Sequence, residues 1–314
     1  MKAVLQYRAS PGFRERLAEL ACEWLEIVVV DERDRERFAR EMVDASVLLH
    51  VLEPVTAAVL AAAPQLRLVQ KLGVGVNTID LDAARERGIA VANMPGTNSQ
   101  AVAEHTLALM LATLRLVPFF DGETRAGRGW QAEGERFDRA GEIGGRTVGL
   151  VGYGAVVARL APVLLALGAT VLYSSRSEPP GAVGRRVALE TLLAESDLVS
   201  LHIPLTPETH HTIDAAALER MHPGAVLVNT ARGALVDEEA LCHALRSRRL
   251  RAAGLDVFER EPVDPQSPLL TLDNVVLSPH IAWLTPETLD RSMSVALENC
   301  RRVRDGEPLL HRVV

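Results

Sequence analysis

The chain has 314 residues and a formal net charge of −7 at neutral pH. This length predicts two domains, because a single hydrophobic core rarely grows much beyond about 250 residues. Hydrophobic residues make up 48% of the chain and charged residues 24%, which is typical of a soluble globular protein. The acidic balance argues against a nucleic-acid or anionic-membrane surface. We interpret the one basic run, residues 246–251, as the solvated end of a helix.

Short apolar runs alternate with helical patterns over residues 1–95. The runs predict strands at 3–6, 27–30, 47–50, 68–71 and 89–92. The helical patterns lie between them at 12–24, 34–42, 56–62 and 80–87. Alternation of this kind predicts a parallel sheet with crossover helices, and hence a small α/β domain.

A long helix is predicted next, at 101–115, with Asn98 or Ser99 as its cap, and a polar, Gly-rich connection follows at 121–145. A second alternation then begins. It predicts strands at 147–151, 170–173, 198–203, 225–229, 252–256 and 275–277 and helices at 155–167, 215–220 and 238–246. The last helix, 286–304, has Thr285 as its cap and Pro286 at its first position, a favourable pair.

Targeting signals and metal-binding patterns are not expected. Residues 1–8 lack the apolar core of a signal peptide. The most apolar window, 101–120, contains Glu104, His105 and Arg115, and therefore predicts a buried helix and no membrane span. The three cysteines are scattered, without a Cys-x-x-Cys pair: Cys22, Cys242 and Cys300. We expect a cytoplasmic protein without a disulfide framework or zinc site.

A glycine-rich turn links the strand 147–151 to the following helix. Gly152 permits a tight turn, and Gly154 lets the backbone approach a pyrophosphate at the helix N-terminus, next to Ala155 and Val156. Val157 replaces the usual third glycine, so we expect this helix to lie slightly farther from the sheet. The alternative is a tight turn that binds no ligand. We favour a dinucleotide-binding loop.

The residues after the next strand bear on which dinucleotide binds. An NAD site usually has a carboxylate about 20 residues beyond the glycines, whereas this sequence has Ser174, Ser175 and Arg176. Two hydroxyls and a guanidinium suit a 2′-phosphate. NADP is therefore favoured, with NAD as the open alternative. A solvated polar turn with little preference is the other interpretation.

Three further segments follow predicted strands: Asn229–Gly233, Asp256–Pro262 and Ser278–His280. Their positions predict that they converge at the carboxyl edge of one sheet. They supply an arginine fork for a carboxylate, a histidine for proton transfer and an acid to oppose its charge. Alone, Arg232 could be a surface ion-pair partner and His280 a loop residue, and either Glu259 or Glu261 could be the acid.

The sequence resembles the D-isomer-specific 2-hydroxyacid dehydrogenases, in particular the glyoxylate and hydroxypyruvate reductases, over nearly the whole chain. The resemblance is carried by these three segments, the glycine turn and residues 73–80, 101–105 and 202–206. It implies hydride transfer between NADP or NAD and a small 2-hydroxy or 2-keto acid. The implied catalytic residues are Arg232 as substrate clamp, Glu261 as partner acid and His280 as acid/base.

The same resemblance implies the binding residues and a homodimer. Backbone amides of Val74 and Gly75 are expected to hold the substrate carboxylate. Expected cofactor contacts are Ser99, Gly152, Gly154, Ala155, Val156, Ser174, Ser175, Arg176, His202, Ile203, Pro204, Thr230, Ala231, Arg232, Asp256 and His280, with Asp256 on the nicotinamide amide side. The expected pocket is mostly apolar and suits glyoxylate, hydroxypyruvate or pyruvate; its residues are His50, Val51, Leu52, Glu53, Leu72, Met94 and Trp283.

The sequence also departs from the family pattern. Asn77-Thr78, Met94 and Trp283 differ from the residues common there, and Trp283 would narrow the mouth of the pocket. His105 is expected to pack in its helix, and His202, His210 and His211 to shape the cofactor loop; no metal site is expected. Dehydrogenases for formate or phosphite, and a non-catalytic dinucleotide sensor or corepressor, are the alternative functions.

Together these patterns predict an α/β protein of two doubly wound parallel-sheet domains. A Rossmann cofactor domain would span residues 96–284. A smaller, flavodoxin-like substrate domain would comprise residues 1–95 with 285–314. The active site is expected in the cleft between the domains, with hinges near 95–100 and 284–286.

Overall fold

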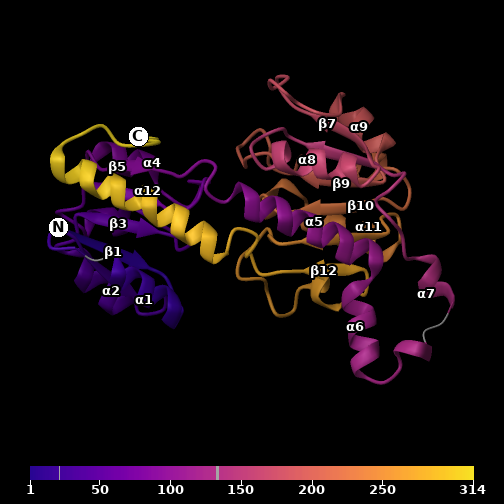
Figure 1. Cartoon of the computed structure of the whole chain (residues 1–314), viewed down its shortest axis with the longest axis horizontal. Coiled ribbons are helices and arrows are strands. Elements are labelled where there is room, and N and C mark those ends of the chain that lie inside the picture. The colour runs from indigo at the N-terminus through magenta and orange to yellow at the C-terminus, as the bar shows by residue number, and fades with distance from the viewer. Residues whose placement is uncertain (21, 132–133) are drawn as a thin grey trace. The chain divides into compact units, whose positions relative to one another are not determined.

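The computed structural model describes residues 1–20, 22–131 and 134–314 (Figure 1). The chain divides into two compact units. Unit 1 comprises Met1–Asn98 and Leu284–Val314, and unit 2 comprises Ser99–Trp283. Each unit has its own parallel sheet with helices around it, so the predicted α/β class with two parallel sheets is confirmed.

Unit 1 contains a five-stranded sheet in the order β2-β1-β3-β4-β5, the flavodoxin-like order. Its strands are β1 (Lys2–Gln6), β2 (Glu26–Val30), β3 (Val47–His50), β4 (Leu68–Lys71) and β5 (Ala90–Ala92). Its helices are α1 (Pro11–Glu19), α2 (Arg35–Met42), α3 (Ala57–Ala61), α4 (Leu81–Glu86) and α12 (Pro286–Asp305).

The apolar strands of unit 1 are explained by burial on both faces. Every residue of β3 and β4 is buried, as expected of a parallel sheet covered by helices. The C-terminal helix α12 belongs to this unit because Asn299 Nδ2 donates to Gln70 Oε1 of β4 at 2.6 Å. Thr285 caps α12 as predicted, with Oγ1 accepting from Thr288 N at 3.1 Å.

Unit 2 contains a seven-stranded sheet in the order β8-β7-β6-β9-β10-β11-β12. This is the Rossmann order with one added strand, β12, at the edge. Its strands are β6 (Thr147–Val151), β7 (Thr170–Ser174), β8 (Arg185–Arg186), β9 (Leu198–Leu201), β10 (Val226–Asn229), β11 (Ala252–Leu255) and β12 (Val275–Leu277). Its α-helices are α5 (Ser99–Arg115), α6 (Val117–Arg125), α7 (Gly134–Asp138), α8 (Val157–Ala166), α9 (Leu189–Glu195), α10 (Ala215–Arg220) and α11 (Glu238–Arg246).

Alternating side chains of these strands pack into two separate cores. In β10, Val226 and Val228 belong to the core formed with α5 and α8. Leu227, between them, belongs to the core formed with α9, α10 and α11. Because helices cover both faces, the loops at the carboxyl ends of the strands are the part of this unit where a ligand is expected to bind.

Three parts of the structure differ from the sequence-based prediction. The expected connection at 121–145 contains the end of α6, the 3-10 helix η1 (Gly129–Gln131) and α7, while residues 132–133 lie outside the described residues. Strand β8 and helix α9 were not predicted from the sequence. In unit 1, the helix predicted at 12–24 ends at Glu19, and residue 21 lies outside the described residues.

Among the described residues, no single helix is long and apolar enough to cross a membrane. Helices α5 and α6 reach that length and composition only as a pair, and a bend of 63° separates them.

Candidate active site

A histidine–glutamate pair lies in the loops that follow β11 and β12. His280 Nδ1 is 2.6 Å from Glu261 Oε2. The other carboxylate oxygen, Oε1, accepts from the backbone amide of Phe258 at 3.0 Å, which orients the acid. Because Nδ1 is engaged by the carboxylate, Nε2 is the ring nitrogen left to exchange a proton with a ligand. The His280 side chain is 20% exposed, so a small molecule has access to it.

The backbone of His280 is held in an unusual conformation. Its φ is +56°, in the left-handed region. The amide of His280 donates to Asp256 O at 2.7 Å, and its carbonyl accepts from Trp283 Nε1 at 3.1 Å. These bonds fix the turn that presents the imidazole. Trp283 therefore supports the histidine directly, a contact that the sequence did not predict.

Asp256 braces the same turn from inside the protein. Its side chain is fully buried. Oδ1 accepts from Ser278 Oγ at 2.6 Å and from Ile281 N at 2.9 Å, and Oδ2 accepts from Ala282 N at 2.8 Å. His105 Nε2 lies 2.8 Å from Ser278 Oγ.

These contacts also decide the charge of Asp256. Burial raises its pKa, but hydrogen bonds from His105, Ser278 and the two amides outweigh burial, and the pKa falls below its usual value. In this structure the carboxylate therefore stabilises the turn that carries His280. The nicotinamide contact expected for Asp256 stays a prediction.

Arg232 lies in the turn after β10. Asn229 closes this turn: its Nδ2 donates to Arg232 O at 2.8 Å and its Oδ1 accepts from Ala231 N at 3.0 Å. Thr230 anchors the turn to α5 through Thr106, with 2.8 Å between the two hydroxyl oxygens. Burial lowers the pKa of Arg232, and the negative charge of Glu261 opposes that shift. Arginine remains protonated in either case, so a cation accompanies the His280–Glu261 pair.

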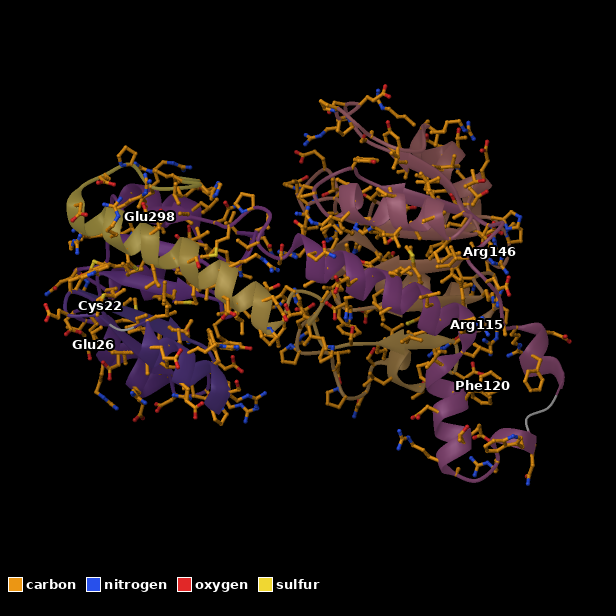
Figure 2. The ribbon with its side chains drawn as sticks, viewed as in Figure 1. Cys22, Glu26, Arg115, Phe120, Arg146 and Glu298 are labelled. Carbon is orange, nitrogen blue, oxygen red and sulfur yellow. The ribbon has the colours of Figure 1, made fainter. Side chains whose placement is uncertain are left out.

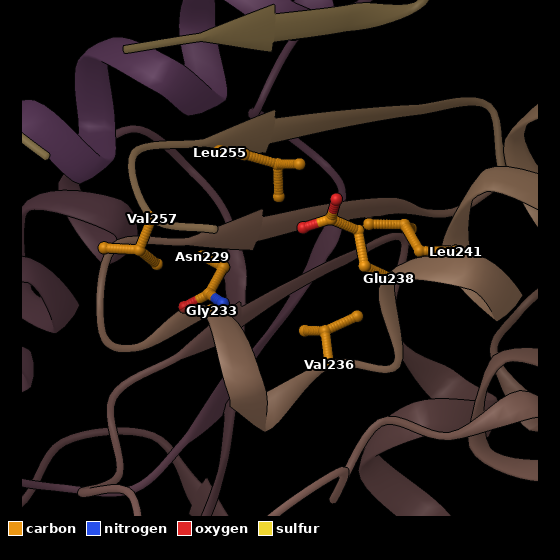
Figure 3. A pocket seen from close by; sticks show the side chains of 7 residues that line it. All are labelled: Asn229, Gly233, Val236, Glu238, Leu241, Leu255 and Val257. Atoms are coloured by element: carbon orange, nitrogen blue, oxygen red, sulfur yellow. The ribbon is translucent and has the colours of Figure 1, made fainter. Parts of the chain in front are cut away.

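Gly233 is required where the β10 and β11 loops approach each other. A Cβ added to Gly233 would lie 1.8 Å from Phe258 C and 2.3 Å from Glu259 N. Behind this contact is a small internal pocket, whose residues are labelled in Figure 3. It has room for about one water molecule, so it is too small for a substrate. The sequence did not reveal this requirement at Gly233.

The glycine turn after β6 has the form of an anion-binding loop. Gly152 has a φ of +100°, and a Cβ there would lie 2.6 Å from His202 O. A Cβ on Gly154 would meet nothing within 4 Å, so its surface is open. No side chain caps α8, whose N-cap is Val156. Its first-turn amides therefore suit a pyrophosphate. Val157, which replaces the usual third glycine of the turn, is fully buried.

The end of β7 places the three residues predicted to bind a 2′-phosphate. Ser174 and Ser175 are half-buried and Arg176 is exposed. Arg186 of β8 donates from Nη2 to Ser175 O at 2.8 Å and to Arg176 O at 2.9 Å. A second guanidinium thus holds this loop. The sequence did not reveal this contact, because β8 consists of two exposed arginines and has no apolar run.

His202, Ile203 and Pro204 follow β9. Ser200 Oγ lies 3.0 Å from His202 Nε2. Desolvation lowers the pKa of His202 to about 4, so this histidine is neutral at physiological pH. His202 is suited to shaping the loop, and not to holding a positive charge there.

In unit 1, the residues expected at the substrate fall into two groups. Four of the seven residues expected to line the pocket are 4% exposed or less, and so form part of the core of unit 1: His50, Val51, Leu72 and Met94. The second group is more accessible. Leu52 is 40% exposed and Val74 is 45% exposed, and Glu53 and Gly75 are half-buried. Of the expected cofactor residues, Ser99 is buried at the start of α5.

Comparisons with known proteins were consistent with this geometry. The family model for the NAD-binding domain of D-isomer specific 2-hydroxyacid dehydrogenases matches residues 107–282. The glyoxylate reductase of Korarchaeum cryptofilum is 42% identical over 270 residues, covering 84% of this chain and 81% of that protein. The D-3-phosphoglycerate dehydrogenase of Mycobacterium bovis is 41% identical over 289 residues, covering 90% of this chain and 54% of that protein.

Solved structures show the same likeness. The TT0316 protein from Thermus thermophilus superimposes with a TM-score of 0.89 at 38% identity, covering all of both chains. This chain belongs to the D-isomer specific 2-hydroxyacid dehydrogenase family. It spans about half the length of the mycobacterial phosphoglycerate dehydrogenases that it matches.

Proposed function

We propose that the protein is an NAD(P)-dependent oxidoreductase that transfers a hydride between the dinucleotide and a small 2-hydroxy or 2-keto acid. The observation that carries the proposal is the 2.6 Å contact between His280 and Glu261, in the same unit as the open Gly154 turn. A sensor needs only the dinucleotide loop. A carboxylate-held histidine accompanied by a half-buried arginine is the set of groups that carbonyl reduction needs.

Each residue has a distinct part in the proposed reaction. When bound, the dinucleotide supplies or accepts the hydride. In the reductive direction, His280 gives a proton from Nε2 to the carbonyl oxygen. Glu261 holds the ring through Nδ1 and opposes the positive charge that His280 carries before that transfer. Arg232 binds the substrate carboxylate and polarises the carbonyl.

NADP is the favoured cofactor of this proposal. Ser174, Ser175 and Arg176 offer two hydroxyls and a guanidinium where an NAD site has a carboxylate. Arg186 supports the preference for NADP. Its bonds to the carbonyls of Ser175 and Arg176 fix the backbone of the loop that carries the two hydroxyls and the guanidinium. A 2′-phosphate would gain charge-assisted hydrogen bonds there. NAD remains the alternative that the rate measurements below distinguish.

A compact keto acid is the proposed substrate. Glyoxylate and hydroxypyruvate suit the bulky Trp283, whose indole is fixed to the His280 carbonyl. The similarity to a glyoxylate reductase over most of both chains supports this choice. The backbone amides of Val74 and Gly75 are the proposed ligands for the substrate carboxylate in unit 1.

A homodimer formed through unit 2 is also part of the proposal. Helices α6 and α7 form an arm that stands away from the sheet, with Phe120 labelled on it in Figure 2. Helix α6 buries none of its residues. Trp130 is 90% exposed, Phe137 57% and Val117 53%. An apolar arm of this kind is suited to contact a second copy of the chain.

The direct test is the initial rate of glyoxylate and hydroxypyruvate reduction, measured in parallel with NADPH and NADH. We expect turnover, faster with NADPH. Faster turnover with NADH would support the proposed enzymatic activity but overturn the preference for NADP. Measurable dinucleotide binding without turnover of any keto acid would overturn the proposed reaction and favour a sensor.

A further inference from the structure

Two imidazoles and a carboxylate form a cluster in unit 2, outside the proposed catalytic set. The nitrogen and oxygen atoms of His210, His211 and Glu259 that could bind a metal all lie within 4.8 Å of one another. The sequence predicts that the two histidines shape the cofactor loop and that they bind no metal. It could not show that Glu259, 48 positions after His211, completes a set of three ligands.

The loop that carries the two histidines is held by its own hydrogen bonds. Thr209 Oγ1 accepts from Thr206 N and donates to Pro204 O, both at 2.7 Å. The amide of His211 donates to Ala234 O at 2.9 Å. The two rings stack with centroids 3.9 Å apart. Their nitrogens are therefore presented by ordered backbone, and little conformational entropy is lost when they bind a ligand.

Two features direct these side chains toward Glu259. His211 has a φ of +51°, a left-handed conformation that is uncommon for residues other than glycine. Its Nε2 lies 2.9 Å from Glu259 Oε1. Glu259 is fixed from the other side by α11: its Oε2 accepts from Glu238 N at 3.4 Å, and Glu238 Oε2 accepts from Glu259 N at 3.1 Å. One oxygen of the carboxylate thus remains for the histidines.

We propose that His210, His211 and Glu259 bind a zinc-class divalent transition-metal ion. Imidazole nitrogen and carboxylate oxygen are ligands that zinc accepts, and three protein ligands leave a fourth position for water. Magnesium and calcium prefer sets made of oxygen atoms alone. In this structure His211 Nε2 lies 2.9 Å from Glu259 Oε1, and a bound ion would replace this direct contact.

The bound ion would connect the loop after β9 to the loop after β11. Glu259 lies next to Phe258, whose amide donates to Glu261. The ion would therefore stabilise the segment that orients Glu261, the carboxylate that contacts His280. Metal binding itself does not depend on the proposed reaction, and it is tested without an activity assay.

The test is titration of the full chain, first treated with a chelator, with Zn²⁺ in a calorimeter and with Co²⁺ by visible absorption. A Cys22→Ser background removes the exposed thiol as a competing ligand. We expect one ion per chain, affinity that falls as the pH is lowered because the ligands must be deprotonated, a higher Tm with Zn²⁺, and no effect of Mg²⁺.

Three variants localise the site. His210→Ala, His211→Ala and Glu259→Gln should each weaken zinc binding by about 10-fold or more and remove the rise in Tm. His243→Ala, which replaces an exposed histidine of α11, is the matched control and should leave both unchanged. The proposal is overturned if the Cys22→Ser protein binds no Zn²⁺ or Co²⁺. It is equally overturned if His211→Ala and Glu259→Gln bind zinc as tightly as their parent.

Discussion

Arg176 is the residue on which the proposed cofactor preference most depends. It is exposed at the end of β7, where its guanidinium can pair with a 2′-phosphate. Arg176→Ala should raise the KM for NADPH by about 10-fold or more, on the scale of a lost charge-assisted hydrogen bond, and should change the KM for NADH little. Arg185→Ala is the control, because Arg185 pairs with Glu195 at 2.6 Å. Equal losses with both dinucleotides would contradict the assignment.

His50 makes the stability of the protein depend on pH. It is 1% exposed, and burial, with the charge of Lys71, lowers its pKa to about 3. The unfolded chain binds this proton near pH 6.5, so between these values the unfolded state binds more protons. The free energy of unfolding should therefore fall as the pH falls, by up to about 1.4 kcal/mol per pH unit from this group.

The measurement is the urea midpoint at pH 7 and pH 5. His50→Gln, which keeps a donor for Glu53 O, should show a smaller decrease than the wild type. His222→Gln, at an exposed position, should match the wild type. An unchanged decrease in His50→Gln would show that His50 does not contribute.

At the scale of elements, the contact between the β10 and β11 loops tolerates no side chain. Gly233→Ala should destabilise the protein by about 1–3 kcal/mol or more, because its Cβ would overlap backbone atoms of Phe258. Urea unfolding measures the effect. Gly154→Ala is the matched control, since its Cβ meets nothing within 4 Å. It should unfold like the wild type but bind the dinucleotide more weakly. Wild-type stability in Gly233→Ala would refute the close approach.

The elements that the sequence predicted best are those with a one-sided or fully buried apolar pattern. β3, β4, β9 and β10 are buried at every position, and their apolar runs are visible in the sequence. β8 consists of two exposed arginines and has no such run. Helix α9 has no side-chain cap, and α6 buries nothing, so each lacks one of the signals from which a helix is predicted.

The site was predictable to a similar and limited degree. The strand ends predicted that Arg232, Glu261 and His280 lie in loops at one edge of the sheet, and these residues do follow β10, β11 and β12; their roles in catalysis stay a prediction. The sequence did not predict which of the expected pocket residues are buried. Leu72 and Met94 are apolar whether they line a pocket or fill a core, and only the packing of unit 1 shows that they are buried. Likewise, only packing reveals the closeness of Gly233 to Phe258.

At the scale of the whole molecule, the proposed dimer depends on the arm of unit 2. Trp130→Ser together with Val117→Ser should convert a dimer to a monomer, because both side chains are largely exposed in a single chain. Light scattering after size-exclusion chromatography measures the mass. Val163→Ser, on α8 of the same unit and 42% exposed, is the control and should remain dimeric. A dimer that survives the double substitution would place the interface elsewhere.

The chain passes between the two units at two points, after Asn98 and after Trp283. The C-terminal residues return to unit 1, where Val313 N donates to Val91 O at 2.7 Å. The proposed proton-transfer pair and dinucleotide turn both lie in unit 2. A defect in these groups should therefore appear in catalysis while the fold of each unit is kept.

The central claim is that His280 transfers the proton, and the most direct measurement is kcat for glyoxylate reduction by the wild type, His280→Ala and the exposed-histidine control His222→Ala. The account predicts that His280→Ala loses about 10²–10⁴-fold in kcat, the usual contribution of a general acid or base. Its circular dichroism should remain that of the wild type. A His280→Ala enzyme with near-normal kcat would contradict the account.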